Sequence, residues 1–169
     1  MKLLIVLGEG GHTKQLLNLV QLIKGLEKQN QKSDNELYSL YYVVTYEDHL
    51  SAGHIKHPGP VYRVTRPRGK STSKLGAAFR TLLAGMQSLV ILLRTRPDAI
   101  ISAGPAVSVP VSVLGKLFGA RIIFIESSSR IRHPSLTGRL MYRWADLFFV
   151  QWQQLQEELP RAVFAGRLV

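Results

Sequence analysis

The sequence predicts an α/β fold in which a Rossmann-like parallel sheet carries helices on both faces. Short apolar runs alternate with stretches of helical periodicity along the whole chain. The first apolar run passes directly into a glycine-rich turn, as the first strand of such folds does. With 169 residues, the chain is long enough for one well-buried core and too short for two full domains. We therefore expect residues 1–169 to form a single domain.

In the first half of the chain, residues 3–7 are apolar and predict a buried strand. A helix is expected from about 12 to 27, because leucine, valine and isoleucine recur there at helical spacing. The polar stretch 28–35 is typical of a loop. Residues 37–45 and 61–64 are rich in valine and tyrosine, which favour the second and third strands.

In the second half, a long helix is expected at about 74–96, and Pro97-Asp98 introduces a strand at 99–102. A second glycine turn at 103–105 opens a helix from about 107 to 118. The remaining elements are a strand at 122–125, a helix at 136–144, a strand at 147–151, a short helical turn ending near Pro160 and a last strand at 163–165. Such alternation is typical of right-handed βαβ units, which place the carboxyl ends of all strands at one edge of the sheet.

The glycine-rich turn at residues 8–13 reads Gly-Glu-Gly-Gly-His-Thr. Glycines allow backbone N–H groups to approach a ligand closely, and the helix N-terminus that follows favours an anion such as a diphosphate. Neither standard nucleotide motif fits, since the dinucleotide fingerprint has glycine where Thr13 stands and the Walker loop needs a Gly-Lys-Ser/Thr that is missing. We expect phosphate binding by Gly8, Gly10, Gly11, His12 and Thr13; the alternative is a turn that only lets the strand and helix pack.

Polar residues also follow other predicted strands, at the edge where open α/β sheets bind ligands. They are Asp48 after the second strand, Gly104 and Pro105 after the fourth, and Glu126, Ser127, Ser128 and Ser129 after the fifth. His12 and Glu126 are the candidate catalytic residues, because an imidazole or a carboxylate with a suitable pKa can orient or deprotonate a hydroxyl. The alternative for Glu126 is a carboxylate that accepts backbone N–H bonds from the following loop, and the alternative for His12 is a residue that only starts a helix.

Several chemistries are not expected. The chain has no cysteine, which excludes a disulfide framework, a thiolate metal site and a cysteine nucleophile. His49, His54 and His57 lie in a loop-like stretch without ligand spacing, so we expect no metal, and no other cofactor is indicated. The serine run lacks the Gly-x-Ser-x-Gly elbow of hydrolases.

A net charge of +11 and a pI near 10.3 predict an acidic partner. The basic stretch 63–74 has no aromatic residue for base stacking, so we do not expect nucleic acid. The helix after it is apolar over most of its circumference, with only a narrow polar stripe at Arg80, Thr81, Gln87, Ser88 and Arg94. Basic flanks and a broad apolar surface are typical of a helix that lies in a membrane interface.

We therefore expect this helix to bind an anionic membrane surface. The residues concerned are Lys74, Leu75, Phe79, Arg80, Leu82, Leu83, Met86, Leu89, Val90, Leu93 and Arg94. The alternative is a crossover helix buried between the sheet and a neighbouring helix. A full membrane span is not expected, because Arg80 and Gln87 would lie in the hydrocarbon.

Motifs distributed over nearly the whole chain carry a family resemblance. They are the turn at 7–13, the stretch 48–56 with Ser51 and Ile55, the segment 97–105, Ile125-Glu126-Ser127, the segment 135–142, Val150-Gln151-Trp152 and the ending 166–169. In this order they resemble the acceptor-side subunit of the two-subunit UDP-N-acetylglucosamine transferase of asparagine-linked glycosylation, and its bacterial counterparts in exopolysaccharide assembly. The chain is similar, more distantly, to the N-terminal half of the peptidoglycan glucosaminyltransferase that glycosylates a lipid diphosphate.

The resemblance implies the N-terminal half of a GT-B glycosyltransferase, which presents a polyprenyl-diphosphate-linked acceptor. A separate donor-binding subunit would hold the UDP-sugar, and the chain would be inactive without it. It also implies a peripheral position on the cytoplasmic face of a membrane. Met1-Lys2 leads directly into the first strand, which resembles the prokaryotic members, so we expect the basic amphipathic helix to be the membrane contact.

The end of the chain follows a predicted strand with no further helix to close the fold. We expect Gly166, Arg167, Leu168 and Val169 to pack on the partner subunit, with Arg167 pairing with a carboxylate there. The alternative is a tail that finishes the edge of its own domain. For the whole chain, the alternative function is a non-enzymatic phosphate- or nucleotide-binding module of flavodoxin-like fold, which would bind a free nucleotide by itself.

Overall fold

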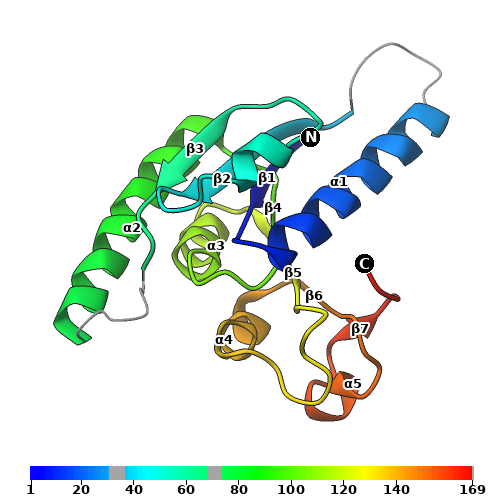
Figure 1. The fold of residues 1–169 in the computed structure, drawn as a ribbon. Coiled ribbons are helices and arrows are strands. Elements are labelled where there is room, and N and C mark those ends of the chain that lie inside the picture. The colour runs from blue at the N-terminus through cyan, green and yellow to red at the C-terminus, as the bar shows by residue number, and fades with distance from the viewer. Residues whose placement is uncertain (31–36, 68–73, 169) are drawn as a thin grey trace.

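The computed structural model describes residues 1–30, 37–67 and 74–168, and Figure 1 shows them as one sheet with helices on both faces. The described strands are all parallel and lie in the order β3-β2-β1-β4-β5-β6-β7. In chain order the elements are β1 (Lys2–Val6), α1 (Gly11–Asn30), β2 (Ser39–Thr45), the 3-10 helix η1 (Ser51–His54), β3 (Val61–Val64), α2 (Lys74–Thr95), β4 (Ala99–Ser102), α3 (Ser108–Leu117), β5 (Arg121–Ile125), α4 (Leu136–Trp144), β6 (Leu147–Val150), α5 (Leu155–Glu158) and β7 (Val163–Phe164). The predicted Rossmann-like fold class is confirmed.

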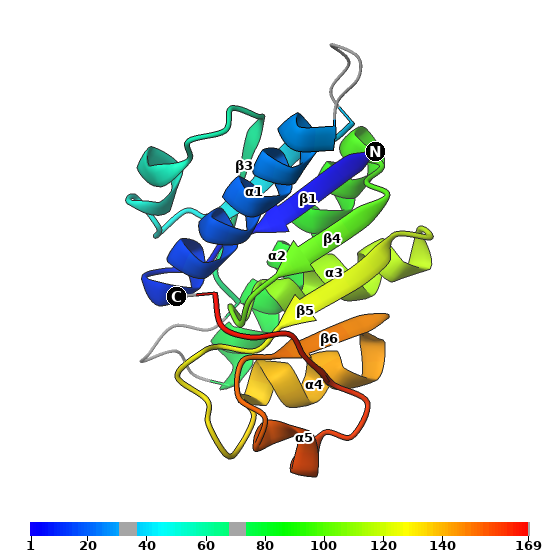
Figure 2. The same ribbon diagram turned by 90° about the vertical axis from the view of Figure 1, so that its right-hand side faces the viewer.

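Two hydrophobic cores lie on opposite faces of the sheet. On one face Leu16 and Val20 of α1 pack against alternate residues of β1, β2 and β4. On the other face α2, α3 and α4 supply buried residues such as Leu92, Val111 and Met141. Figure 2 shows α1 on the near side of the sheet and these three helices behind it. The strands read as continuous apolar runs because both of their faces are covered.

The structure differs from the prediction at the start of β2, which begins at Ser39 and not at residue 37. The backbone N–H groups of Leu37 and Tyr38 donate to the carboxylate of Glu27 on α1, and so are not available to a strand. Lys24 pairs with the same carboxylate at 2.9 Å. A second difference is η1, which the sequence did not predict; its Ser51 N–H donates to Asp48 Oδ1 at 2.9 Å.

Helix α2 has two unlike sides. Its buried side carries Ala84, Ile91 and Leu92, which pack toward β3 and α3. Ser88 was predicted in an exposed polar stripe, and this is wrong: it is fully buried and its hydroxyl donates to the Ala84 carbonyl at 2.6 Å. The outer side exposes an unbroken row of apolar side chains, which we call the α2 stripe: Leu75, Phe79, Leu82, Met86, Val90 and Leu93.

Helix α2 combines features of both alternatives that the sequence left for it, and its membrane contact stays a prediction. The helix is a crossover from β3 to β4 with one packed side, and it also has an exposed apolar side. Leu83 and Leu89, which were predicted to contact the membrane, are half-buried and lie outside the stripe. Among the described helices, Leu75–Thr95 alone is long and apolar enough to cross a membrane by length and composition. The side chain of Lys74 and the basic stretch from 68 to 73 lie outside the described residues.

Candidate functional site

A cleft of about 610 Å³ lies at the carboxyl edge of the sheet. It is lined by Gly8, Glu9, His12, Thr45, Arg66, Gly104, Pro105, Ala106, Val107, Ser127, Ser129, Arg130, Ser135, Leu136 and Thr137. The sheet order reverses here, because the chain runs from β1 outward to β3 and then returns to β4 on the other side of β1. Crevices at such switch points are where open α/β sheets bind ligands.

The two glycine turns predicted from the sequence meet in this cleft. A Cβ atom on Gly8 would lie 2.7 Å from the Pro105 Cβ, and one on Gly104 would lie 2.5 Å from the His12 Cε1. Gly104 also has a φ of +80°, which L side chains rarely adopt. The close contact of the turns therefore depends on glycine at both positions.

Helix α1 begins at Gly11, so the N–H groups of its first turn face the glycine turn and have no acceptor within the helix. The positive end of the helix dipole adds to their attraction for an anion. Gly10 has a φ of +66°, and a Cβ there would meet nothing within 4 Å, so open space surrounds this part of the turn. The arrangement suits a phosphate or diphosphate group.

His12 lines the cleft beside the second glycine turn. Its imidazole lies against Gly104, and its buried Nδ1 has no hydrogen-bond partner among the described residues. Burial and the positive charge of Arg130 lower the pKa of His12 below its usual value. The ring is therefore neutral at pH 7, the form that can accept a proton from a hydroxyl.

Two arginines line the cleft, and their role was not predicted. Arg66, just after β3, is held by Glu9 through a two-point contact, with Nη1 2.9 Å from Oε1 and Nη2 3.0 Å from Oε2. The backbone N–H of Arg130 donates to the Ser127 carbonyl at 2.9 Å, which turns the loop after β5 toward the cleft. In the sequence, the position of Arg66 and Arg130 near predicted strands was the only indication that these two arginines line the cleft.

Glu126 was predicted as a candidate catalytic residue, but the geometry favours the alternative role. Its side chain is fully buried and does not line the cleft. Oε1 accepts the Ser127 N–H at 2.9 Å, and Oε2 accepts the N–H and hydroxyl of Ser135 at 3.0 and 3.1 Å. Ser135 in turn caps α4 by accepting the Gly138 N–H at 2.9 Å. Glu126 thus fixes the loop between β5 and α4, with both oxygens occupied.

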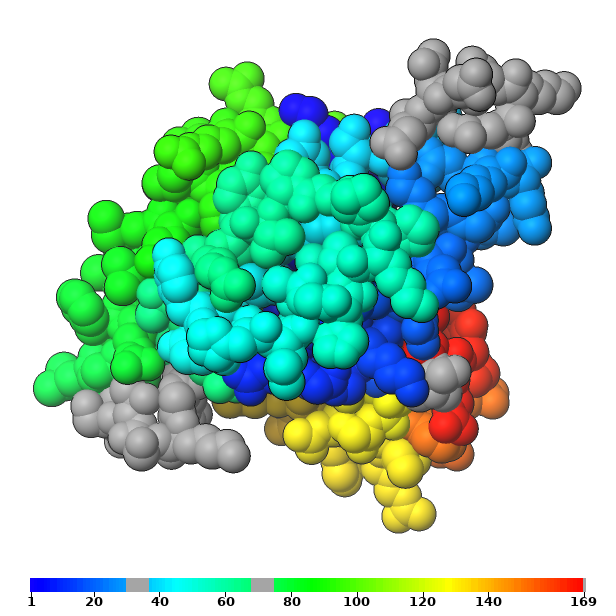
Figure 3. Space-filling model, turned by 45° about the horizontal axis from the view of Figure 1, so that its top comes forward, coloured from blue at the N-terminus to red at the C-terminus, as the bar shows by residue number. Residues whose placement is uncertain are grey.

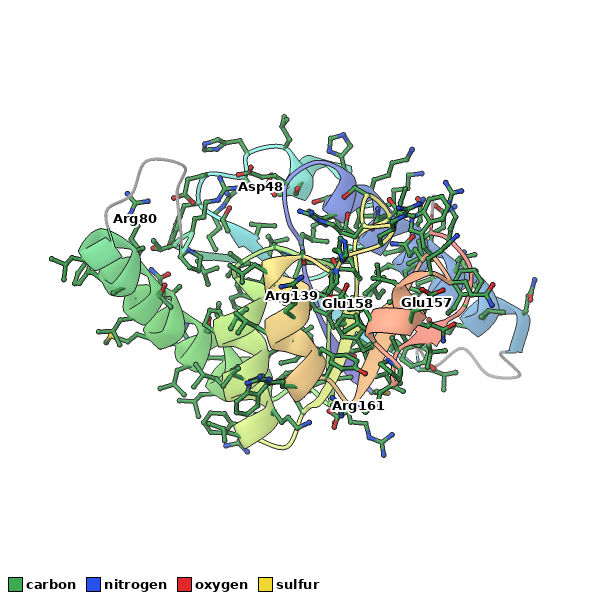
Figure 4. All side chains as sticks on the ribbon, turned by 90° about the horizontal axis from the view of Figure 1, so that it is seen from below. Asp48, Arg80, Arg139, Glu157, Glu158 and Arg161 are labelled. Carbon is green, nitrogen blue, oxygen red and sulfur yellow. The ribbon has the colours of Figure 1, made fainter. Side chains whose placement is uncertain are left out.

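Three other predicted site residues turn away from the cleft. The Thr13 hydroxyl donates to the Gly8 carbonyl and bonds to the Ser51 hydroxyl at 2.6 Å, and so ties the glycine turn to η1. Asp48 is buried beside η1, and Figure 4, which views the carboxyl edge, shows it well apart from Arg139 of α4. The Ser128 hydroxyl accepts the Gln15 side-chain amide at 2.6 Å. The Thr13 and Ser128 hydroxyls and Asp48 Oδ1 thus serve the scaffold of the site, whereas the buried Asp48 Oδ2 has no hydrogen-bond partner among the described residues.

The carboxyl-terminal tail lies against its own domain. The Leu168 N–H donates to Gln151 Oε1 at 2.9 Å, and the Arg167 guanidinium stacks 4.5 Å from the centre of the Trp152 ring. Leu168 packs against the core on the α1 face. These contacts favour the alternative that the tail finishes its own domain, at least in the free chain; the contact with a partner stays a prediction, and Val169 lies outside the described residues.

No group of three or more histidine, cysteine, aspartate or glutamate side chains within residues 1–30, 37–67 and 74–168 is placed to hold a metal ion. His54 of η1 bonds instead through Nδ1 to the Leu50 carbonyl at 2.8 Å.

Comparison with solved structures shows the same fold. MurG of Acinetobacter baumannii superposes with a TM-score of 0.69 at 17% identity, over 90% of this chain and 42% of that one. The UDP-GlcNAc 2-epimerase of Methanocaldococcus jannaschii superposes with a TM-score of 0.69 at 15% identity, over 99% of this chain and 47% of that one. The chain thus spans less than half of each structure.

Sequence comparison gives relatives that align over the full chain. The mouse protein named UDP-N-acetylglucosamine transferase subunit ALG14 is 30% identical over 100% of this chain and 83% of its own length. The Schizosaccharomyces pombe protein of the same name is 29% identical over 97% of this chain and 81% of its own length. Residues 3–168 match the family described as "Oligosaccharide biosynthesis protein Alg14 like". The resemblance inferred from the sequence is thus confirmed, and the chain belongs to the Alg14-like family of oligosaccharide biosynthesis proteins.

Proposed function

We propose that this chain is the acceptor-binding subunit of a two-subunit GT-B glycosyltransferase. Its relatives are named as subunits of a UDP-N-acetylglucosamine transferase, and the chain corresponds in fold to less than half of the MurG structure. A GT-B enzyme needs two Rossmann-like halves with the reaction between them, each on the order of 150 to 200 residues. The chain supplies one half, and a donor-binding partner supplies the other.

The observation that carries this proposal is the composition of the carboxyl-edge cleft. It combines a glycine turn at a helix N-terminus, the guanidinium groups of Arg66 and Arg130, and the neutral imidazole of His12. The helix N-terminus and the guanidinium groups can bind the diphosphate of a polyprenyl-diphosphate-linked sugar. The imidazole can accept the proton of the acceptor hydroxyl of that sugar.

In the proposed reaction the acceptor hydroxyl attacks the anomeric carbon of the UDP-sugar. The new glycosidic C–O bond forms as the bond from the anomeric carbon to the UDP oxygen breaks, and UDP leaves on the partner subunit. The hydroxyl proton passes to His12 or to a base on the partner, and inversion at the anomeric carbon follows from direct displacement. Glu126 acts at a distance from the reacting atoms, by holding Ser127 and Ser135 in the cleft wall.

The α2 stripe is the proposed membrane contact, which would place the protein peripherally on the cytoplasmic face. Six exposed apolar side chains follow one side of a helix that carries Arg80 in its second turn and Arg94 in its last turn. Each basic residue near an anionic bilayer contributes about 1 kcal/mol. Replacing Phe79 and Leu82 by glutamate should release the protein from anionic liposomes without lowering its melting temperature, since both side chains are mostly exposed. Wild-type protein that does not sediment with such liposomes would contradict the membrane role.

The tail from Gly166 to Val169 is the proposed contact with the donor-binding subunit. The stacked Arg167 and Trp152 present a cationic, aromatic surface, and aromatic and arginine side chains are enriched in protein interfaces. Deleting Leu168 and Val169 should reduce co-purification with the partner. A lowered melting temperature with intact pairing would show instead that the tail serves only its own domain.

Reconstitution of the two subunits tests the function itself. We expect no sugar transfer from UDP-N-acetylglucosamine to a polyprenyl-diphosphate sugar by this chain alone, and transfer when the donor-binding half is added. His12→Ala should lower the turnover of the complex more than tenfold, since one positioned acid–base group contributes about 10²–10⁴-fold. His49→Ala is the matched control, because His49 is exposed outside the cleft. Equal turnover by wild type and His12→Ala would place the base on the partner, and transfer by the lone chain would overturn the two-subunit proposal.

A further inference from the structure

The carboxyl-terminal tail contacts two neighbouring residues, Gln151 and Trp152, which follow directly after β6. The Leu168 N–H donates to Gln151 Oε1 at 2.9 Å. The Arg167 guanidinium stacks on the Trp152 ring. Figure 3 shows the tail, in red, on the surface beside the first half of α1, in blue. The tail and this residue pair belong to the motifs of the family resemblance, yet none of their described residues lines the carboxyl-edge cleft.

The side-chain amide of Gln151 joins three segments of the chain. It is 2% exposed, and besides accepting from the tail it donates to Gln15 Oε1 of α1 at 3.0 Å. It also donates to the Glu126 carbonyl, just after β5, at 2.9 Å. Gln15, itself buried, donates through Nε2 to the Ser128 hydroxyl at 2.6 Å. A buried amide network with these partners in place holds the tail, α1 and the loop after β5 relative to one another.

Trp152 contacts the loop after β5 directly. Its Nε1 donates to the Ser128 carbonyl at 2.6 Å. Ser128 is therefore held at its hydroxyl by Gln15 and at its carbonyl by Trp152, and both connections lead back to the tail. The two residues next to Ser128 in the chain line the cleft, and so does Arg130. Two chains of contacts thus run from the tail to the cleft wall.

We propose that Gln151 and Trp152 are positioning residues that couple the carboxyl-terminal tail to the cleft wall that carries Arg130. This inference rests on the proposed function, which makes the tail the contact with the donor-binding subunit and the cleft the diphosphate site. A subunit docked on the tail as it lies here restricts Arg167 and Leu168, and through them the loop after β5. The complex then binds the acceptor diphosphate more tightly than the free chain does. Because coupling is reciprocal, bound diphosphate strengthens the contact between the subunits by the same factor.

The double variant Trp152→Phe, Leu168→Pro tests the coupling in the isolated chain. Phenylalanine keeps an aromatic ring for Arg167 but loses the Nε1–H bond to Ser128, and proline loses the N–H bond to Gln151. The net charge is unchanged. The matched control is Trp144→Phe, Leu168→Ala, because Trp144 lies on α4 outside the network and alanine keeps the backbone N–H.

Two readouts report the cleft wall. Burial and Arg130 lower the pKa of His12, so an NMR titration of its ring detects a displaced wall. Comparison with His12→Gln identifies its signals. We expect the pKa of His12 to rise toward its usual value in the test variant, and the affinity for inorganic diphosphate to fall by about fivefold or more. The control variant should match wild type in both readouts.

The reciprocal effect is measured with the donor-binding subunit. Inorganic diphosphate should raise the affinity of the wild-type chain for that subunit by about fivefold or more, and should do so less in the test variant. An affinity between wild-type subunits that diphosphate leaves unchanged would overturn the coupling.

The other failures are distinguishable. A lowered melting temperature with unchanged His12 pKa and diphosphate affinity would show that the tail contacts only stabilise the fold, and the coupling would be overturned while the proposed function stands. The same shifts in the control variant would also overturn it. If wild type binds no diphosphate, the diphosphate site of the proposed function is wrong, and the His12 titration still decides whether the tail and the cleft wall are coupled.

Discussion

The loops after β1 and β5 lie at the same edge of the sheet but use their polar groups differently. In the glycine turn after β1, a Cβ on Gly10 or Gly11 would meet nothing within 4 Å, and the buried His12 Nδ1 has no hydrogen-bond partner among the described residues. In the loop after β5, Glu126 accepts three hydrogen bonds from Ser127 and Ser135. The loop after β1 thus keeps a polar group available for a ligand, whereas the carboxylate in the loop after β5 is used to hold its own loop in place.

This difference shows how a residue that can bind a ligand is distinguished from a residue that stabilises the fold. Both loops follow buried strands and both carry residues typical of active sites, so position alone does not distinguish them. Burial and hydrogen-bond accounting do, because the Glu126 carboxylate is fully buried outside the cleft lining and already accepts three hydrogen bonds from its own loop. We expect substitutions in the loop after β5 to lower the free energy of unfolding, and substitutions around His12 to lower turnover.

The largest effect is expected from Glu126→Ala. It would leave the Ser127 and Ser135 N–H groups without their acceptor in a buried site, which costs about 1–3 kcal/mol for each unsatisfied group. We expect the free energy of unfolding, measured by urea denaturation, to fall by about 3 kcal/mol. Glu126→Gln should lose less, because its amide oxygen can still accept one of these bonds. A normal unfolding midpoint together with lost turnover would make Glu126 catalytic and break the comparison.

A smaller effect is expected from Gly104→Ala. The new Cβ would collide with the His12 ring, and the residue would keep a left-handed backbone at a cost of about 1–2 kcal/mol. We expect a modest fall in melting temperature and a larger fall in the turnover of the two-subunit enzyme. Gly85→Ala in α2 is the matched control, since it has open space around it and should be neutral or slightly stabilising. Unchanged turnover in Gly104→Ala would show that the position of His12 is not critical.

The smallest effect is the pH dependence that His12 gives to stability. Its pKa in the folded chain is lowered by burial and Arg130, so below about pH 6.5 the unfolded chain takes up a proton that the folded chain resists. The stability that the neutral ring contributes is therefore present above that pH and is lost as the pH falls toward the lowered pKa. Wild type should lose stability on acidification more steeply than His12→Gln, measured by urea denaturation between pH 7.5 and 5. Parallel curves would mean that the ring is not desolvated in the cleft.

Much of the fold could be predicted from the sequence because its signals are local. Apolar runs and helical spacing gave the main strands and helices to within a few residues, and parallel topology then placed the strand ends at one edge. The start of β2 could not be predicted in this way, because it depends on Glu27 of α1 reaching the N–H groups of Leu37 and Tyr38. Likewise, the two sides of α2 depend on where β3 and α3 pack.

The candidate site could be predicted only in part. Gly8, His12, Gly104 and Ser127 do line the cleft, as expected from their places after strands. Thr13 and Asp48 follow strands equally well, but their partners lie in η1, a short helix without a periodic pattern. Arg130 reaches the cleft through the turn of the β5 loop, in which a local bond to the Ser127 carbonyl is joined by contacts of Ser128 with the distant Gln15 and Trp152. The tertiary packing determines which polar groups remain free to bind a ligand, so the sequence pattern alone does not identify them.

The central claim is that this chain holds the acceptor diphosphate in the cleft around His12, Arg66 and Arg130, while the donor site lies on another subunit. Equilibrium binding to the isolated chain tests it directly, with a sugar-linked prenyl diphosphate and UDP-N-acetylglucosamine as the two ligands. We predict that the prenyl diphosphate binds, that Arg130→Ala weakens this binding, and that UDP-N-acetylglucosamine does not bind until the proposed donor-binding subunit is added. Micromolar binding of UDP-N-acetylglucosamine by the chain alone, with no binding of the prenyl diphosphate, would contradict it.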